Sequence, residues 1–229
     1  MLRRSERHWL SAIRKLPLSG GDWRYSRHAR VPGPAQGWKI HVSATILSAA
    51  EVFARCHPIL RKHRACFKVP ASLGFLASLN SGLPNFSQVG KFLTVYPSSI
   101  NQATELAREL HEATRGLEGP RIPFDAVYRR GSLVHYRYGA FRRFNGRDPQ
   151  TLRGPRGERL QDKRAPGKAV PSWVTDPFVA DPQKTKFFKF TGPIGVELIA
   201  FNAKMQRGKG GVYEALDLSV SPPRVVIIK

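Results

Sequence analysis

The sequence predicts an α+β fold, with a mixed, largely antiparallel sheet and flanking helices. Segments with the two-residue period of strands alternate with segments of helical spacing as far as residue 115, whereas strand-like segments predominate in the second half. This late concentration of strands favours α+β. The pattern divides the chain into an N-terminal segment (1–34), a main domain (35–182) and a β-rich C-terminal region (183–229).

The composition indicates a folded protein with an anionic partner or substrate. The 229 residues, 41% of them hydrophobic, suffice for one packed domain or for a domain with an additional fragment. The formal net charge of +22 makes nucleic acid the general expectation and phosphorylated or acidic peptides the sharper one. Cys56 and Cys66 form neither a disulfide framework nor a metal motif. No apolar run is long enough for a signal peptide or a membrane span, so we expect a soluble, cytoplasmic protein.

The strand expected over residues 37–45 carries the most informative residues. Side chains alternate along a strand, so Lys39, His41 and Ser43 project to one face and the apolar residues between them to the other. A cation and a proton shuttle about 7 Å apart by strand rise can serve one small anion. Lys and His also alternate on ordinary solvent-facing strands, and that is the commoner situation.

Capping and breaking residues mark the first helices. An amphipathic stretch surrounds Trp9 near the N-terminus. Further along, Ser48-x-x-Glu51 has the capping-box pattern and predicts a helix that Pro58 should kink or split.

The middle of the chain predicts two strands and the clearest helix. A short strand is expected over 65–69, a loop over 78–90, and a strand over 90–97 that proline stops. Apolar residues then recur at helical spacing over 99–115, and Gly116 lies where a C-cap glycine belongs.

A further strand over 132–141 leads into a basic loop, residues 142–168. Nine basic residues stand there among Gly, Pro and Gln, offset only by Asp148, Glu158 and Asp162. This composition predicts a mobile hairpin-like loop or an anion-gathering lid, and a solvated loop without a task fits it equally well.

The region from residue 186 predicts a small antiparallel sheet. Its strands are expected over 187–190, 194–201, 213–216 and 225–229. A glycine turn containing Gly208, Gly210 and Gly211 lies between two of these strands, and the last strand ends at Lys229. This order is typical of the start of a protein-kinase N-lobe, but no catalytic loop or DFG follows, so we expect no phosphate transfer from ATP.

Three further basic residues lie on expected strands: Lys68, Lys91 and Arg137. Lysines are usually kept off buried strands, so repeated cations at strand centres indicate convergence on an anion. The sequence lacks paired carboxylates for glycosidase chemistry, a His/Cys metal cluster, a GxSxG elbow and a Walker loop. We therefore expect these three residues to line one open cleft together with Lys39 and His41.

Such a site suits the elimination of phosphate from phosphoserine or phosphothreonine. A base removes the Cα proton, the phosphate leaves from Cβ, and a dehydroamino acid forms. A lysine can be this base if nearby cations and desolvation lower its pKa, and the same cations neutralise the leaving phosphate. A protonated histidine can donate to the departing oxygen.

Four segments, in this order and spacing, resemble the N-terminal phosphoserine/phosphothreonine lyase domain of class III lanthipeptide synthetases, which are bacterial lyase–kinase–cyclase enzymes. The segments are GWKIHVSAT (37–45), CFKV (66–69), GKFLTVYP (90–97) and VHYRYGAF (134–141). The resemblance covers roughly residues 35–180. The tail, with GKGGVY (208–213) and VIIK (226–229), resembles the opening of the kinase domain. Because that resemblance stops at Lys229, we expect a fragment or a truncated gene product.

The resemblance implies that Lys68 is the general base and His41 the general acid. The residues implied to bind substrate phosphate are Lys39, Lys91, Arg137 and Arg130, the last for its position in the adjoining turn. The implied partner is a phosphorylated precursor peptide, converted to dehydroalanine or dehydrobutyrine in lanthipeptide biosynthesis. No cofactor or metal is implied for the lyase, and ATP and Mg²⁺ would enter only with a complete kinase domain. Bacterial effector phosphothreonine lyases are similar in chemistry.

Other functions fit parts of this pattern. His41 could be a sheet histidine satisfied by a neighbour, and Lys68 and Lys91 could extend from strand edges. Arg137 could pair structurally with a carboxylate such as Asp125. The competing classes are a non-catalytic basic module that binds nucleic acid or a leader peptide, and an inactive remnant. Against nucleic acid, the sequence has no helix-turn-helix, RRM or zinc pattern, and its aromatic residues are not interleaved with the basic loop.

Overall fold

The computed structural model describes most of the main domain and much of the C-terminal region. The described residues are 2–17, 21–26, 34–82, 86–141, 151–162, 170–178, 189–191, 197–207 and 210–229.

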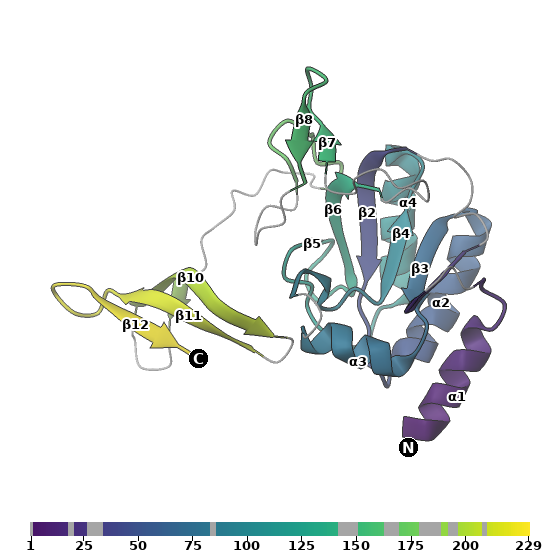
Figure 1. Cartoon of the computed structure of the whole chain (residues 1–229), viewed down its shortest axis with the longest axis horizontal. Helices are drawn as coiled ribbons and strands as arrows, with labels where there is room; N and C mark the ends of the chain where they lie inside the picture. Colours follow the sequence, from purple (N-terminus) through teal and green to yellow (C-terminus); the bar gives the residue numbers. More distant parts are fainter. Residues whose placement is uncertain are drawn as a thin grey trace.

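A six-stranded sheet forms the centre of the larger part of the molecule (Figure 1), in the order β1-β3-β4-β2-β6-β5. Its strands are β1 (Trp23–Tyr25), β2 (Gln36–Val42), β3 (Cys66–Pro70), β4 (Leu93–Tyr96), β5 (Ala126–Val127) and β6 (Val134–Ala140). All five neighbouring pairs are antiparallel. Four helices accompany the sheet: α1 (Leu2–Ile13), α2 (Ala49–Lys62), α3 (Leu73–Ser81) and α4 (Ile100–Ala113). The expected α+β class with a largely antiparallel sheet is confirmed.

The two faces of β2 differ as its alternation predicts. Trp38, Ile40 and Val42 are buried in one hydrophobic core, which also contains Leu106 and Leu110 of α4. Because helices cover this face, the polar residues of β2 must project from the opposite face of the sheet. The core thus fixes which side of the sheet can hold the site.

The N-terminal segment belongs to the same folded unit. Trp9 and Ile13 of α1 are fully buried in the common core, and Trp9 contacts the ring of Phe53 at 5.5 Å between centroids. Strand β1 adds an edge to the sheet by pairing with β3. The expected segment 1–34 therefore contributes to the structure of the main domain, because its apolar residues complete the core.

The helices differ in detail from the sequence expectation. The expected loop over 78–90 is wrong at its start, because α3 extends to Ser81; Ser72 caps this helix by accepting from Phe75 N, and Gly82 ends it at φ +77°. Helix α2 continues through Pro58 without splitting. Ser48 precedes α2 but makes no side-chain cap: its hydroxyl donates to Glu118 O at 2.9 Å.

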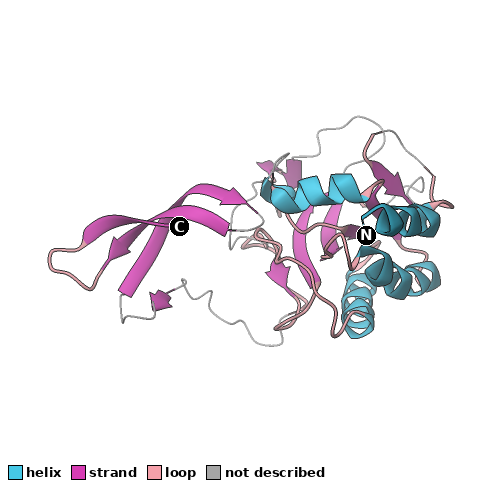
Figure 2. Cartoon of the chain, turned by 90° about the horizontal axis from the view of Figure 1, so that it is seen from below, coloured by secondary structure: helices cyan, strands magenta, loops and turns pink. Residues whose placement is uncertain are grey.

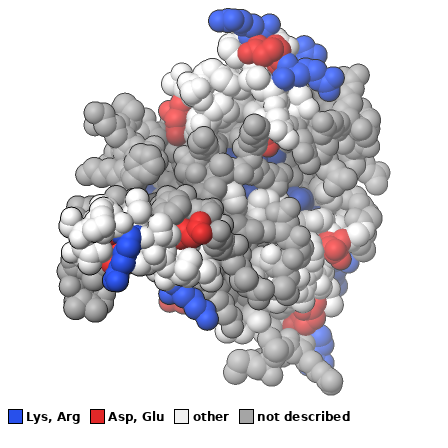
Figure 3. Space-filling model, turned by 60° about the vertical axis from the view of Figure 1, so that its left-hand side comes forward, with Lys and Arg blue, Asp and Glu red and all other residues white. Residues whose placement is uncertain are grey.

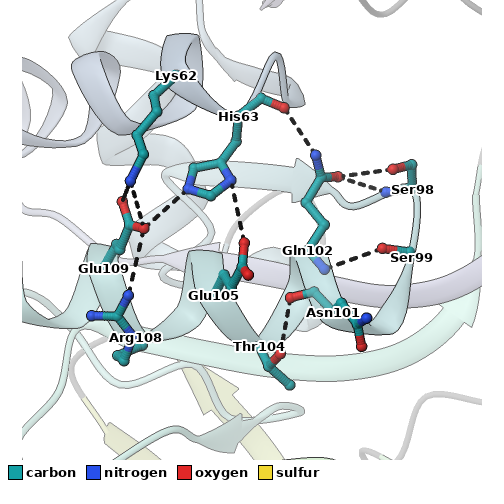
Figure 4. Close-up of polar contacts among 10 residues, drawn as sticks. All are labelled: Lys62, His63, Ser98, Ser99, Asn101, Gln102, Thr104, Glu105, Arg108 and Glu109. Carbon is teal, nitrogen blue, oxygen red and sulfur yellow. Dashed lines mark hydrogen bonds and ion pairs between the residues drawn. The ribbon is translucent and has the colours of Figure 1, made fainter.

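Polar side chains join the end of α2 to α4 (Figure 4). Lys62 Nζ lies 3.0 and 3.1 Å from the two carboxylate oxygens of Glu109, and His63 Nε2 lies 3.2 Å from one of them. Gln102 of α4 donates to the His63 carbonyl at 2.9 Å. These contacts hold the two helices together where they extend beyond the apolar core.

Two smaller sheets complete the described structure. Strands β7 (Thr151–Arg153) and β8 (Arg159–Gln161) form a hairpin, so the expected hairpin-like loop is confirmed for residues 151–162; 142–150 and 163–168 lie outside the described residues. Strands β9 (Lys189–Thr191), β10 (Glu197–Arg207), β11 (Gly210–Asp217) and β12 (Arg224–Ile228) form the expected small antiparallel sheet. Figure 2 shows the helices beside the six-stranded sheet and none of the described ones beside the C-terminal sheet. No helix in the described part of the chain is both long and apolar enough to cross a membrane.

Candidate functional site

One row of polar side chains crosses the six-stranded sheet. Its members, each directly opposite the next, are Tyr25, Lys68, Thr94, His41 and His135. Directly opposed residues in an antiparallel sheet project from the same face, so Lys68 and His41 share a face although two strand spacings, about 10 Å, separate their backbones.

Lys39 and Arg137 extend this polar face. They oppose each other across β2 and β6, two residues along from the His41–His135 pair. Both are buried, at 8% and 3% exposure, on the face away from the helix-covered core. Four of the residues predicted from the sequence thus share one face, although they come from three strands.

Asp125 connects the fifth predicted residue to this face. Lys91 precedes β4, so its placement on a strand was wrong. Its Nζ lies 3.3 Å from Asp125 Oδ1, and the other carboxylate oxygen contacts His41 Nδ1. All three side chains are buried, with the Asp125 side chain fully so. Because a carboxylate only accepts, neutral His41 donates through Nδ1 and presents an unprotonated Nε2.

Burial and neighbouring charges govern protonation at this pair. Burial lowers the pKa of His41, and Lys91 and Lys39 lower it further against the opposing effect of Asp125, giving a pKa of about 3. Burial alone would raise the pKa of Asp125, but Lys91 and His41 stabilise its charged form, and the net shift is downward. The free site therefore holds a charged Asp125 beside a neutral His41.

Arg137 has a different partner from the one considered from the sequence. Its guanidinium contacts Asp162 Oδ1, in a pair whose side chains are each 3% exposed, and Asp162 Oδ2 accepts from Ala140 N at 3.0 Å. Arg137 does pair with a carboxylate, as considered from the sequence, but the carboxylate is Asp162, which directly follows β8, and not Asp125. This carboxylate fixes the orientation of the arginine.

Lys68 is more exposed than the other four predicted residues. Its Nζ lies 3.7 Å from the centre of the Trp23 ring, a cation–π contact with the edge strand β1. Lys39 Nζ lies 6.0 Å from the Phe141 ring. These aromatic rings provide the apolar parts of a site that otherwise consists of charged groups.

The other predicted residues lie elsewhere. Arg130 is exposed and lines a hollow at the C-terminal end of α4 with His111, Arg115 and Ser132, a hollow that none of the five residues lines. Gly210 and Gly211 begin β11 and Lys229 follows β12, while Gly208 lies outside the described residues. Within the described ranges, no group of three or more His, Cys, Asp or Glu side chains is placed to hold a metal ion.

Sequence reasoning missed three buried residues of this face: Asp125 as the His41 partner, Asp162 and His135. His135 donates through Nδ1 to Leu133 O at 3.0 Å and accepts from Ile122 N at 3.4 Å, which ties the connection carrying Asp125 to β6. A signal existed for His135, because it stands two residues before Arg137 on the same strand. The two acids lie outside the strands, where no period predicts their position.

A protein-family model matches most of the chain. The family model described as the N-terminal domain of RamC matches residues 14–187. The chain belongs to the RamC N-terminal domain family. Membership confirms the resemblance to the lyase region of class III lanthipeptide synthetases that the four motifs indicate. The match includes every residue of the polar face.

Relatives of this RamC N-terminal domain protein include one curated sequence and several solved structures. It is 34% identical over 202 residues to a probable SapB synthase of Streptomyces coelicolor; the aligned part is 86% of this chain but only 22% of that protein. The structures include the phosphothreonine lyase effector VirA of Chromobacterium violaceum, with a TM-score of 0.38, 14% identity and coverage of 59% and 84% of the two chains. The phosphothreonine lyase SpvC of Salmonella has a TM-score of 0.35, 16% identity and coverage of 59% and 88%.

Proposed function

We propose that this domain eliminates phosphate from phosphoserine or phosphothreonine in a precursor peptide, giving dehydroalanine or dehydrobutyrine in lanthipeptide biosynthesis. The observation that carries the proposal is the convergence of Lys39, His41, Lys68 and Arg137 on one face of the sheet, with Lys91 tied to His41 through Asp125. Membership in the RamC N-terminal domain family supports the same reaction class.

The charges of this face match a phosphate dianion. Lys39, Lys68, Lys91 and Arg137 supply four positive charges, and Asp125 and Asp162 supply two negative ones. The excess of two positive charges is about the charge of a phosphomonoester at neutral pH. Moving a proton from Lys68 to His41 leaves this total unchanged, so both protonation states carry the same net charge toward phosphate.

His41 acts as the general acid once substrate is bound. Phosphate adds negative charge beside the imidazole, which raises the pKa of His41 from its low value in the free site. Asp125 accepts from Nδ1 and so directs Nε2 toward the leaving oxygen. The proton on Nε2 then goes to the phosphate oxygen as the Cβ–O bond breaks.

Lys68 acts as the general base. Its neutral amine takes the Cα proton, the electrons of the Cα–H bond form the Cα–Cβ double bond, and phosphate leaves with the Cβ–O electrons. Lys39, Lys91 and Arg137 bind the phosphate oxygens and stabilise the charge that develops on them. The reaction consumes no metal or cofactor.

In this proposal, the C-terminal region (183–229) belongs to a further domain of a larger enzyme. The C-terminal sheet, and the sequence positions Gly208, Gly210, Gly211 and Lys229, correspond in it to the opening of a kinase domain, which would use ATP and Mg²⁺ to phosphorylate the precursor peptide. A cyclase domain then acts on the dehydrated product. The lyase requires neither domain for its own chemical step.

Mass spectrometry of a phosphoserine peptide tests the proposed reaction. Wild-type chain should give a product one water lighter than the corresponding serine peptide, and Lys68→Ala should abolish this product while phosphopeptide binding stays nearly intact. His41→Ala should be slower by on the order of 10²–10⁴. Lys39→Ala should also weaken phosphopeptide binding, by about 1.5–3 kcal/mol. Full activity in Lys68→Ala would overturn the assignment of the base.

A further inference from the structure

The β7–β8 hairpin is anchored to the two strands that carry Lys39 and Arg137. The side chain of Gln36, on β2, contacts the backbone of Arg153, on β7. It donates to Arg153 O at 2.9 Å and accepts from Arg153 N at 2.6 Å. After β8, Asp162 binds both Arg137 and the backbone of Ala140. Leu152 is buried at 4% exposure. The hairpin is therefore held directly beside the polar face that contains Lys39 and Arg137.

The other side of the hairpin carries unneutralised positive charge. Arg153 and Arg159 are exposed and directly opposite each other, and Arg156 is exposed in the turn between them. Glu158 is also exposed, but its carboxylate accepts from the backbone N of Arg156 at 2.9 Å. None of the three guanidinium groups forms an ion pair with another described residue. Figure 3 shows basic side chains around an acidic one at the hairpin, at the top of the view.

Two arginines in direct opposition are unfavourable in an isolated sheet, because like charges destabilise a cross-strand pair. An anionic ligand that contacts both removes this repulsion and gains two charge-assisted contacts. The hairpin has no aromatic residue over 151–162 on which a base could stack, so it lacks the second element of a single-stranded nucleic acid site. An acidic peptide fits these features better.

We propose that the outer face of the β7–β8 hairpin, formed by Arg153, Arg156 and Arg159, binds an acidic segment of the substrate peptide. The inference rests on the proposed function in one respect: the acidic segment belongs to the same peptide as the phosphorylated residue. Its consequence is a substrate preference: the domain favours phosphorylated residues that lie near glutamate or aspartate in the sequence.

Binding and elimination test the two proposals separately. First, fluorescence anisotropy measures the binding of a labelled glutamate-rich peptide that carries no phosphate. It compares the wild-type chain with the hairpin variant Arg153→Gln/Arg159→Gln and with a control variant, Arg55→Gln/Arg108→Gln, in which two other exposed arginines are replaced. The last variant changes the net charge equally but alters only α2 and α4. The hairpin variant should bind about fivefold more weakly, as expected for two exposed ion pairs, and the control should bind like wild type. Arg153→Lys/Arg159→Lys retains the charges and should retain binding.

Second, elimination rates are measured for phosphoserine peptides that carry either two glutamates or two glutamines. These residues are placed at several distances before or after the phosphoserine. Wild type should prefer a glutamate peptide, and Arg153→Gln/Arg159→Gln should lose this preference. Equal anisotropy in the hairpin and control variants would overturn the inference, as would binding of an oligonucleotide but not of the acidic peptide. If wild type eliminates phosphate from no peptide, the proposed function fails, and the anisotropy measurement still decides the binding surface.

Discussion

At the residue scale, the cations of the site could be predicted but their carboxylate partners could not. Lys39, His41, Lys68 and Arg137 are basic residues within expected strands, which marks them as candidates, and alternation places Lys39 and His41 on one face of their common strand. Asp125 lies in a connection between elements, and its position depends on how the chain passes from α4 back to β6. The side chain that orients His41 was therefore known only from the tertiary structure.

Asp125→Asn should impair both stability and activity. The amide cannot balance Lys91 and His41, and breaking a buried ion pair costs about 3–5 kcal/mol. Without the carboxylate, His41 also loses the partner that directs Nε2, so elimination should fall by on the order of 10²–10⁴. Glu51→Gln, which removes an exposed partner of Arg55, is the control and should change neither quantity measurably. An unchanged elimination rate in Asp125→Asn would exclude its role in orienting His41.

Stability should fall as the pH drops below about 6.5, in part because of His41. Its pKa in the folded chain is about 3, below the ordinary value of 6.5, so the unfolded chain binds more protons between these values. His41 therefore contributes its full stabilisation above pH 6.5 and loses up to about 1.4 kcal/mol per pH unit below it. Burial also lowers the pKa of His57 and His135, which act in the same direction.

Urea unfolding at pH 7 and pH 5 measures this effect. His41→Asn should lose less stability between the two values than wild type does, whereas His8→Asn, on the exposed side of α1, should behave like wild type. An identical loss in His41→Asn and wild type would show that His41 is not held neutral by the fold.

At the element scale, the connection that carries Asp125 is held by close backbone contacts. His135 accepts from Ile122 N, and Gly90 packs against the same stretch. Gly90 has φ +76°, and a Cβ there would lie 2.9 Å from Ile122 Cγ1 and 3.2 Å from Arg121 O. Glycine at this position allows the segment before Lys91 to lie against the segment before Asp125.

Gly90→Ala should therefore reduce elimination as well as stability. Gly116→Ala is a matched control, because Gly116 has φ +78° but no atom lies within 4 Å of the position that an alanine methyl group would take there. Both variants should lose about 1–2 kcal/mol from the left-handed backbone conformation, and Gly90→Ala should lose more because the methyl group displaces the connection. Thermal unfolding and elimination rates compare the two. Equal losses of stability, with normal elimination in both, would contradict the role of this contact.

Local sequence predicted most of the elements of the main sheet. The strands around Lys39, Lys68 and Arg137 and the helix over 100–113 follow from their periods and end residues. Helix α3 was missed, although Ser72 and Gly82 are its cap residues, because its last turn ends in Asn80 and Ser81 and runs into a Ser-, Asn- and Gly-rich stretch that resembles a loop. Register across the sheet, which aligns Lys68 with His41, depends on long-range pairing that no local pattern reveals.

At the scale of the whole molecule, two groups of basic residues among the described ones differ in their surroundings. Lys39, Lys91 and Arg137 are buried beside Asp125 and Asp162, where they suit a phosphate group. The arginines of the β7–β8 hairpin are exposed and unpaired with described residues, where they suit an extended acidic chain. The net charge thus predicted an anionic partner, but only the fold separates the buried cations of the proposed site from the exposed arginines of the hairpin.

The central claim is that this domain breaks a Cα–H bond as it releases phosphate. A phosphoserine peptide deuterated at Cα, incubated with the wild-type chain and followed by mass spectrometry, tests it directly. Elimination predicts a product that has lost the Cα deuterium together with the whole phosphate, including the oxygen that was bonded to Cβ, and that does not form with Lys68→Ala. A product that retains the deuterium and has the mass of the Cα-deuterated serine peptide would mean hydrolysis, and would contradict the proposed elimination.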